Sequence, residues 1–280
     1  MTVLPANAPR AAEVLAQAGA ENFPVASRLF PRELRPHLMN VYGFARMIDD
    51  IGDEAAGDRS ALLDWVASEL DAVFGGRPAH PLMTSLAATV ERFALPREPF
   101  DRLIEANRRD QTIHRYPTYR ELADYCTYSA NPVGELVLRI SGTLTPERLA
   151  LSDSTCTGLQ LVEFWQDLGE DATSDRVYVP LEDMERFGYS MEQLLAGEND
   201  DRFVQLMRFE AARTRALLLE GRKLARSIGG RIGLAVRLFA AGGLAALGDL
   251  ERRRFDTFGT SARASRPWRA ATALKELTRR

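Results

Sequence analysis

The chain has 280 residues, 45% of them hydrophobic, so it is long enough to bury a sizeable core. Its 36 basic and 39 acidic residues give a net charge of -3, which creates no field that would favour nucleic acid as a partner. The two cysteines, Cys126 and Cys156, are too few for a disulfide framework and are expected to be core residues.

Helical periodicity dominates the chain. Apolar residues recur every three or four positions and alternation with a period of two is almost absent, so we predict an all-α protein. No internal repeat or low-complexity linker interrupts residues 1–280, which are expected to form a single domain. Helices are predicted at residues 9–19, 32–52, 60–73, 80–93, 97–112, 118–141, 145–170, 190–196, 201–228, 230–256 and 267–277. Their start signals include Ser60, Thr118 with Glu121, Thr145 before Pro146, and Ser190 with Gln193.

Two segments bear on location. The N-terminus lacks the basic start and apolar run of a secretory signal, so we expect a cytoplasmic protein. The most apolar segment, residues 232–250, is interrupted by Arg237 and by Gly242-Gly243, and it is shorter than the roughly 20 apolar residues that span a bilayer. It therefore predicts a buried core helix. Peripheral membrane contact stays open, although no basic amphipathic stretch requires it.

The helix expected at 32–52 ends in an acidic cluster. Asp49 and Asp53 are four residues apart and lie one above the other, while Asp50 sits at the edge of the same arc, so all three can converge on one point. Like charges placed so close repel one another, and the C-terminal end of the helix dipole disfavours anions further. The arrangement is therefore expected to require a compensating cation.

A proline interrupts the helix expected at 118–141. Pro132 lies within Ser129-Ala-Asn-Pro-Val-Gly134 and removes one helical hydrogen bond, so a kink is predicted at this point. Such a kink frees backbone carbonyls toward whatever it faces.

A second acidic cluster lies in the helix expected at 145–170 and just beyond it. Gln160, Glu163, Asp167 and Asp171 fall on one narrow helical stripe. Apolar residues flank this stripe, so its carboxylates are expected to border an apolar interior; they are Leu161, Val162, Phe164, Trp165 and Leu168.

Two carboxylate helices favour magnesium chemistry. Mg²⁺ prefers oxygen ligands and is typically held by one or two carboxylates together with substrate phosphates. A diphosphate held between two such helices would become a better leaving group. A single Asp pair four residues apart is usually only a solvated face, but two clusters in apolar sequence favour a metal site. His80 and His114 lack the spacing of a zinc or catalytic site, and hydrolase, kinase and dinucleotide motifs are absent from the sequence.

The sequence resembles the squalene/phytoene synthases along nearly its whole length. The matching stretches are Tyr42-Gly-Phe-Ala-Arg46-Met-Ile-Asp49-Asp50-Ile-Gly-Asp53, the segment from Asp110 to Leu122, Tyr125-Cys-Thr-Tyr128-Ser-Ala-Asn-Pro-Val-Gly134, Gln160 through Asp171, and Arg176-Val-Tyr-Val-Pro180. This resemblance implies an isoprenoid synthase-type helical bundle around a central cavity, with two aspartate-rich helices facing that cavity.

Within the family, residues 21–27 and the Ser-Ala-Asn-Pro-Val-Gly element are most similar to the hydroxysqualene synthases of bacterial hopanoid biosynthesis. The resemblance implies that Mg²⁺ assists ionisation of presqualene diphosphate and that water captures the rearranged cation as hydroxysqualene, without nicotinamide. The sequence departs from the family pattern at Glu163, where asparagine is usual, and at Glu135, where a basic residue is expected. These departures put the metal stoichiometry and one phosphate contact in question.

Roles follow for individual residues. The preferred Mg²⁺ ligands are Asp49, Asp53, Asp167 and Asp171, with Asp50, Gln160 and Glu163 as secondary candidates. Arginine suits phosphate recognition, which singles out Arg46, Arg263 and Arg266, although surface ion pairing explains the last two almost as well. The resemblance places Asn22 and Phe23 at the diphosphate end of the cavity, and a helix cap explains Asn22 equally well. Substrate cations or a water are candidate partners of Tyr42, Tyr125 and Tyr128, with core packing as the default for any one of them.

Two alternatives stay open. One is the head-to-head condensation of two farnesyl diphosphates to presqualene diphosphate, or onward to squalene or phytoene. The other is a non-catalytic binding or assembly protein on the same fold, against which the intact aspartate sets argue. The sequence does not indicate an oligomeric state.

Overall fold

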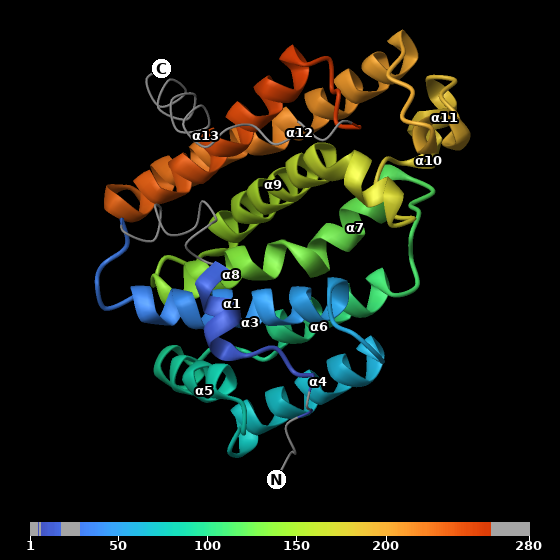
Figure 1. Cartoon of the computed structure of the whole chain (residues 1–280). Helices are drawn as coiled ribbons and strands as arrows, with labels where there is room; N and C mark the ends of the chain where they lie inside the picture. Colours follow the sequence, from blue (N-terminus) through green and yellow to red (C-terminus); the bar gives the residue numbers. More distant parts are fainter. Residues whose placement is uncertain (1–4, 6, 18–28, 259–280) are drawn as a thin grey trace. The chain divides into compact units, whose positions relative to one another are not determined.

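The computed structural model describes residues 5, 7–17 and 29–258 of the chain (Figure 1). In these residues the secondary structure is helical, apart from an isolated β-bridge that pairs Arg115 with Val177. The helices are α1 (Ala11–Gln17), α3 (Arg35–Asp53), α4 (Arg59–Gly75), α5 (Pro81–Phe93), α6 (Glu98–Asp110), α7 (Tyr119–Ser129), α8 (Asn131–Ile140), α9 (Pro146–Thr173), α10 (Leu181–Arg186), α11 (Met191–Leu195), α12 (Asp201–Ile228) and α13 (Gly230–Arg252). The all-α prediction is confirmed.

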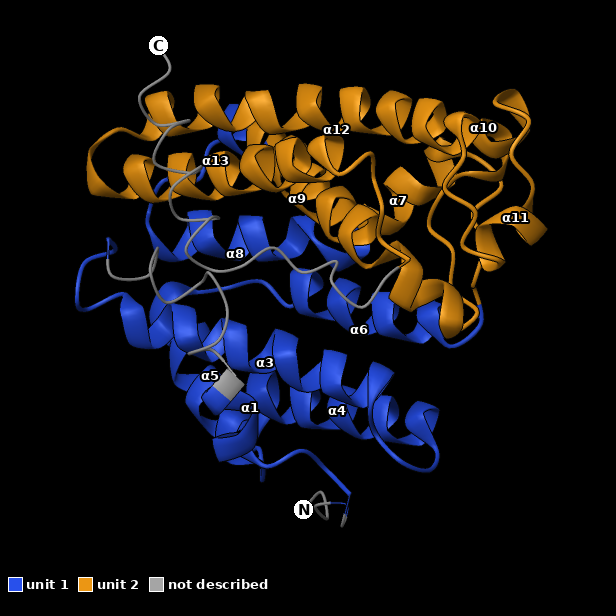
Figure 2. Ribbon diagram, turned by 45° about the horizontal axis from the view of Figure 1, so that its top comes forward, with its two compact units in different colours: residues 1–112, 127–149 blue, residues 113–126, 150–280 orange. Residues whose placement is uncertain are grey.

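The chain divides into two compact units (Figure 2). Unit 1 comprises residues 1–112 and 127–149, and unit 2 comprises residues 113–126 and 150–280. The chain passes from one unit to the other after α6, within α7 and within α9, so the units are not consecutive segments. The two units are compact parts of the chain and are not shown to fold independently. The expectation of a single domain therefore stays a prediction.

Unit 1 is built around α3, which packs against α1, α4, α5, α6 and α8. Its apolar face buries Val41, Phe44 and Ile48, as the three- and four-residue spacing predicts. The Phe44 ring meets the edge of Phe100 from α6, with centroids 5.3 Å apart. This packing fixes the position of α3 within the unit, and its last turn carries the acidic cluster.

Unit 2 contains the long antiparallel pair α12 and α13, which lie side by side in both views (Figures 1 and 2). Gly229 and Gly230, with φ of +69° and +56°, form the sharp turn between them, a backbone conformation that other residues rarely adopt. Close approaches link these helices to α9 and to each other. A Cβ at Gly243 would lie 2.9 Å from Leu159, and a Cβ at Gly221 would lie 2.8 Å from Ala240.

Most predicted helix starts are confirmed. Ser190 and Gln193 form a reciprocal capping box, Thr118 and Glu121 exchange the same pair of bonds, and the Thr145 hydroxyl accepts from the backbone N–H of Arg148. The start assigned to Ser60 is wrong, because the Asp58 carboxylate caps α4 by accepting from Ala61 N–H at 2.9 Å.

The prediction of one kinked helix over 118–141 is also wrong. The segment forms two helices, α7 and α8, that meet at Ala130, and Pro132 lies in the first turn of α8, where its missing N–H leaves no helical bond unmade. The short helix α10 was not predicted, because its six residues carry no full apolar period. The helix predicted at 267–277 lies outside the described residues.

Helix α13 is the segment predicted to be a buried core helix. Among the described residues it is the helix long and apolar enough to cross a membrane by length and composition, and 56% of its most apolar window is buried within the protein. Arg237 and the Gly242-Gly243 pair do not interrupt it. The helix is therefore consistent with the predicted packing role.

Candidate active site

The acidic cluster of unit 1, here called the α3 stripe, consists of Asp49, Asp50 and Asp53 in the last two turns of α3. The Asp49 Oδ1 accepts a hydrogen bond from Asn107 Nδ2 of α6 at 3.2 Å. The Asp50 carboxylate lies 2.7 Å from the Arg46 guanidinium, one turn earlier on α3. Two of the three carboxylates are thus held by different partners and do not simply share one point.

The environment of Asp49 favours its neutral form. The residue is exposed, yet neighbouring protein atoms desolvate its carboxyl group strongly enough to raise the pKa of Asp49 to about 7. The Asn107 hydrogen bond and the charge of Arg46 lower this pKa, while the charges of Asp53 and Asp110 raise it. A nearby cation would favour the ionised carboxylate.

Two arginines supply part of the positive charge that the sequence argument required. Arg46 lies 3.8 Å from Glu54 as well as 2.7 Å from Asp50. Arg59 donates to the backbone carbonyls of Gly52 and Asp53 at 3.0 and 2.9 Å. A cation on the last carbonyls of a helix offsets the unfavourable position of acidic residues there. Repulsion within the stripe is therefore a weaker argument for a metal than the sequence alone indicated.

The acidic cluster of unit 2, here called the α9 stripe, consists of Glu163, Asp167 and Asp171 at four-residue intervals on α9. The Gln160 amide lies 3.5 Å from the Glu163 carboxylate, at the long limit for a hydrogen bond. Glu163 is exposed, and the two aspartates are half-buried. The flanking apolar residues Leu161, Val162, Phe164, Trp165 and Leu168 are buried, as predicted.

Four aromatic rings pack behind the α9 stripe within unit 2. Phe164 of α9 stacks on Tyr178 with centroids 3.8 Å apart, and Tyr116 and Tyr125 lie within about 6 Å of Tyr178. A backbone hydrogen bond from Val177 N–H to the His114 carbonyl holds the two segments together, so that Tyr116 and Tyr178 lie side by side. Tyr125 is 5% exposed, so in this unit it is a core residue. Tyr116 and Tyr178 lay within the stretches that resemble the family but received no role.

Tyr128 and Tyr42 are both half-buried and belong to unit 1. The Arg109 guanidinium of α6 lies 3.6 Å above the Tyr128 ring, so a cation already occupies one face of that ring. A role for Tyr128 toward a substrate cation is left with its other face or its hydroxyl. Tyr42 lies two turns before Asp49 on the same side of α3. Its substrate role stays a prediction.

Several predicted contacts fall outside the described residues. They are Asn22, Phe23, Arg263 and Arg266, and their roles stay predictions.

The unusual Glu135 has a structural explanation. Its carboxylate is buried and accepts from Arg102 at 2.7 Å and from Arg139 at 2.8 Å, all within unit 1. Arg102 also donates to the Thr127 carbonyl at 3.1 Å. Glu135 is therefore the anion between two arginines that tie α6 to α8, a structural role in place of the phosphate contact expected from a basic residue.

Sequence reasoning missed Asn107 and Asp110 of α6 as neighbours of Asp49. The signal was present, because Asn107 continues the apolar spacing of Phe100, Leu103 and Ile104 and so falls on the buried face of an amphipathic helix. A polar residue at such a position needs a hydrogen-bonding partner.

The donor set is made of oxygen atoms. Among the described residues no three His, Cys, Asp or Glu side chains gather into a preformed metal cage. Carboxylates distributed on two helices, without histidine or cysteine, fit the preference of Mg²⁺ for one or two protein carboxylates completed by substrate phosphate. The residues that would hold it are Asp49 and Asp53 of the α3 stripe and Asp167 and Asp171 of the α9 stripe, and metal binding itself stays a prediction.

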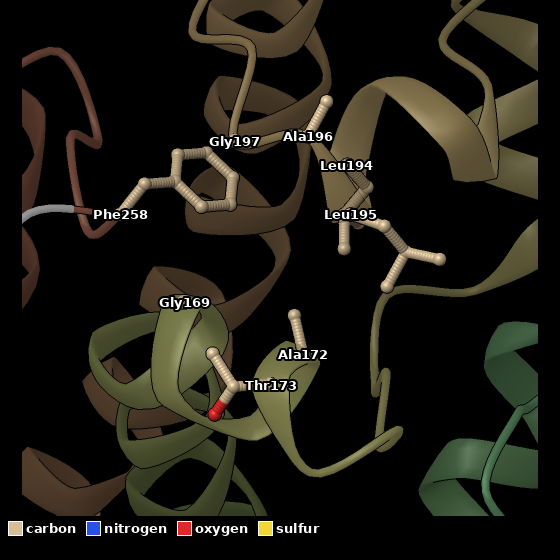
Figure 3. Close-up of a pocket in the computed structure, with 8 residues that line it drawn as sticks. All are labelled: Gly169, Ala172, Thr173, Leu194, Leu195, Ala196, Gly197 and Phe258. Atoms are coloured by element: carbon tan, nitrogen blue, oxygen red, sulfur yellow. The ribbon is translucent and has the colours of Figure 1, made fainter.

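A pocket of about 330 Å³ lies on the other side of α9 (Figure 3). Its lining comprises Gly169, Ala172, Thr173, Leu194, Leu195, Ala196, Gly197 and Phe258. Gly169 is about 200° around the helix from Asp167, so this pocket does not include the α9 stripe.

Comparison with known proteins agrees with the helical architecture. The crystal structure of squalene synthase HpnC from Alicyclobacillus acidocaldarius matches with a TM-score of 0.83 and 44% identity, covering 87% of this chain and 93% of that one. The fold is thus that of the helical isoprenoid synthases.

The family model for squalene/phytoene synthase matches residues 16–271. Hydroxysqualene synthase from Rhodopseudomonas palustris is 35% identical, over 79% of this chain and 76% of its own length. Phytoene synthase from Arthrospira platensis is 30% identical, over 87% and 84% respectively. The chain belongs to the squalene/phytoene synthase family.

Proposed function

We propose that this protein is a hydroxysqualene synthase that converts presqualene diphosphate to hydroxysqualene with Mg²⁺. The observation that carries the proposal is a pair of carboxylate stripes, on α3 and on α9, in a chain of the squalene/phytoene synthase family. Similarity to the Rhodopseudomonas palustris and Sinorhizobium fredii hydroxysqualene synthases, each 35% identical, supports this reaction.

The reaction breaks one C–O bond, rearranges C–C bonds of the carbon skeleton and forms a new C–O bond. The C–O bond to diphosphate breaks and diphosphate leaves with the electron pair. The resulting cyclopropylcarbinyl cation rearranges, and a water oxygen then bonds to the product cation and loses a proton. Bound Mg²⁺ would supply charge neutralisation for the departing diphosphate.

The chain's own residues would bind the diphosphate group and neutralise its charge. Asp49 and Asp53 of the α3 stripe and Asp167 and Asp171 of the α9 stripe would be the ligands of Mg²⁺. Arg46, released from Asp50, would donate to diphosphate oxygens through its planar guanidinium. Apolar side chains around each stripe would exclude water from the early cation, so that capture by water follows the rearrangement.

The direct test supplies presqualene diphosphate and Mg²⁺ to the purified protein and identifies products by mass spectrometry while following released diphosphate. Hydroxysqualene and diphosphate in equal amounts are expected, without nicotinamide. Asp49→Ala and Asp167→Ala are expected to abolish turnover while circular dichroism shows an unchanged helix content. Full activity in either variant would contradict the assigned site.

The similarity to phytoene synthase gives a second candidate, head-to-head condensation of two prenyl diphosphates. Farnesyl diphosphate offered alone with Mg²⁺ separates the two. Formation of presqualene diphosphate or a C30 hydrocarbon would favour condensation, whereas recovery of unchanged farnesyl diphosphate supports the first proposal.

A binding protein without catalysis is the remaining alternative. Calorimetry with Mg²⁺ and a non-hydrolysable farnesyl diphosphate analogue separates it, because a scaffold protein would show no metal-dependent heat. Metal-dependent binding together with turnover excludes this alternative.

A further inference from the structure

Asn107 of α6 lies against Asp49 of the α3 stripe. Its side-chain Nδ2 donates to Asp49 Oδ1 at 3.2 Å and lies 3.4 Å from the Leu103 carbonyl of its own helix. The residue is 7% exposed, so the amide is shielded from solvent. A buried amide that donates to a carboxylate restricts the rotation of that carboxylate.

Gly52 provides the space for this amide. A Cβ built on Gly52 would lie 2.2 Å from Asn107 Oδ1, closer than nonbonded atoms approach, and 3.2 Å from its Cγ. Gly52 lies within a helix, where glycine is less stable than alanine, and its φ is not in the left-handed region. The close contact with Asn107 therefore explains why this position is a glycine.

A second α6 side chain binds the same turn without touching a carboxylate. Gln111, one turn after Asn107, donates to the Gly52 carbonyl at 3.2 Å. Asn107 and Gln111 both tie α6 to the end of α3, and only Asn107 reaches an acidic side chain. This difference separates a structural tie from control of the carboxylate.

We propose that Asn107, seated against Gly52, is a positioning residue that holds the Asp49 carboxylate in the orientation needed to bind a divalent cation. The inference rests on the proposed function, in which Asp49 is a metal ligand. Partners that orient a ligand typically contribute 10- to 100-fold to metal affinity.

The test measures Mn²⁺ affinity of the full chain by electron paramagnetic resonance in the presence of pyrophosphate, alongside the thermal midpoint. Asn107→Leu removes the donor at similar volume, and Gly52→Ala displaces the amide by steric contact. Both are expected to weaken Mn²⁺ binding by roughly tenfold or more. Gln111→Leu, the matched control, is expected to lower the thermal midpoint and leave Mn²⁺ affinity unchanged.

A double variant distinguishes displacement from unfolding. Asn107→Ser combined with Gly52→Ala makes room for the new methyl group, so the thermal midpoint should recover relative to Gly52→Ala while Mn²⁺ affinity stays low. Wild-type affinity in a folded Asn107→Leu protein would overturn the inference, as would absence of pyrophosphate-dependent Mn²⁺ binding by the wild type. A product other than hydroxysqualene would contradict the proposed function alone, because the Mn²⁺ affinities are measured without turnover.

Discussion

The two carboxylate stripes are supported in different ways. The α3 stripe ends its helix, and polar partners hold it: Asn107 binds Asp49, Arg46 binds Asp50, and Arg59 binds the carbonyls of the last turn. The α9 stripe belongs to a helix of 28 residues whose backbone is fixed by close packing within unit 2. A Cβ at Gly169, between Asp167 and Asp171, would lie 2.3 Å from the Thr257 carbonyl oxygen.

The difference follows from position along a helix. Acidic residues in a last turn oppose the helix dipole and need cations and donors nearby. Carboxylates on a long helix are oriented by the backbone, so their precision depends on how tightly that backbone is packed. The α3 stripe should therefore respond to polar substitutions, and the α9 stripe to changes of volume.

Neutralising one carboxylate should give the largest loss of activity, and the loss should be the same for either stripe. Asp49→Asn and Asp167→Asn keep the side-chain size but lose the charge, and each is expected to lower kcat/KM for presqualene diphosphate about 10³-fold, or about 4 kcal/mol. Steady-state kinetics at saturating Mg²⁺ measures this loss. Glu147→Gln, in the first turn of α9 and away from the stripe, is the control that should retain activity. A large loss in one stripe only would show that the two do not act in the same step.

Unit 2 also contains a buried carboxyl group, that of Glu210, which makes the stability of the fold depend on pH. Burial, and then the hydrogen bond that protonated Glu210 donates to the neighbouring Asp183, raise the pKa of Glu210 from 4.5 to about 8, although Arg213 opposes this shift. Because the folded pKa exceeds the unfolded one, the contribution to stability is complete below about pH 4.5 and is lost as pH rises to about 8.

The free energy of unfolding is therefore expected to fall by a few kcal/mol between pH 5 and pH 8.5. Chemical denaturation at several pH values measures it. Glu210→Gln should flatten this dependence, whereas Glu185→Gln, an exposed residue of α10, should leave it as in the wild type. The same slope in Glu210→Gln would assign the pH dependence to other groups.

Added volume on the face of α9 opposite the stripe should affect stability next. Gly169→Ala places a methyl group against the backbone of Thr257 and Phe258, which cannot move as a flexible side chain does, and is expected to lower the unfolding free energy by ~1–3 kcal/mol. Gly242→Ala on α13 meets no atom of the described residues within 4 Å and should stabilise the protein by ~0.5–1 kcal/mol through helix propensity. Calorimetric midpoints of the two variants should therefore move in opposite directions.

The fold was more predictable than the site. Apolar spacing located α3, α9 and α12, because a helix that buries one face carries apolar residues every three or four positions along its sequence. The break between α7 and α8 was placed as a kink, since sequence alone does not show whether chain after a proline continues or restarts a helix. The carboxylates were found from spacing. Their partners Asn107 and Arg59 were missed, because contacts between helices depend on tertiary packing, and Asn22, Phe23, Arg263 and Arg266 lie outside the described residues.

The smallest effect tests whether the α3 stripe depends on the cation at its helix end. Arg59 donates to the carbonyls of Gly52, Asp53 and Ala55. Arg59→Gln removes the charge that offsets the acidic last turn, and should lower the unfolding free energy by ~1 kcal/mol at low ionic strength. Because salt screens this interaction, the loss should shrink in 1 M NaCl. Arg77→Gln changes an exposed arginine of the same unit and should have no comparable effect. A loss of equal size at both salt concentrations would assign the contribution of Arg59 to its hydrogen bonds, and the end of α3 would then resemble α9 in depending on geometry more than on charge.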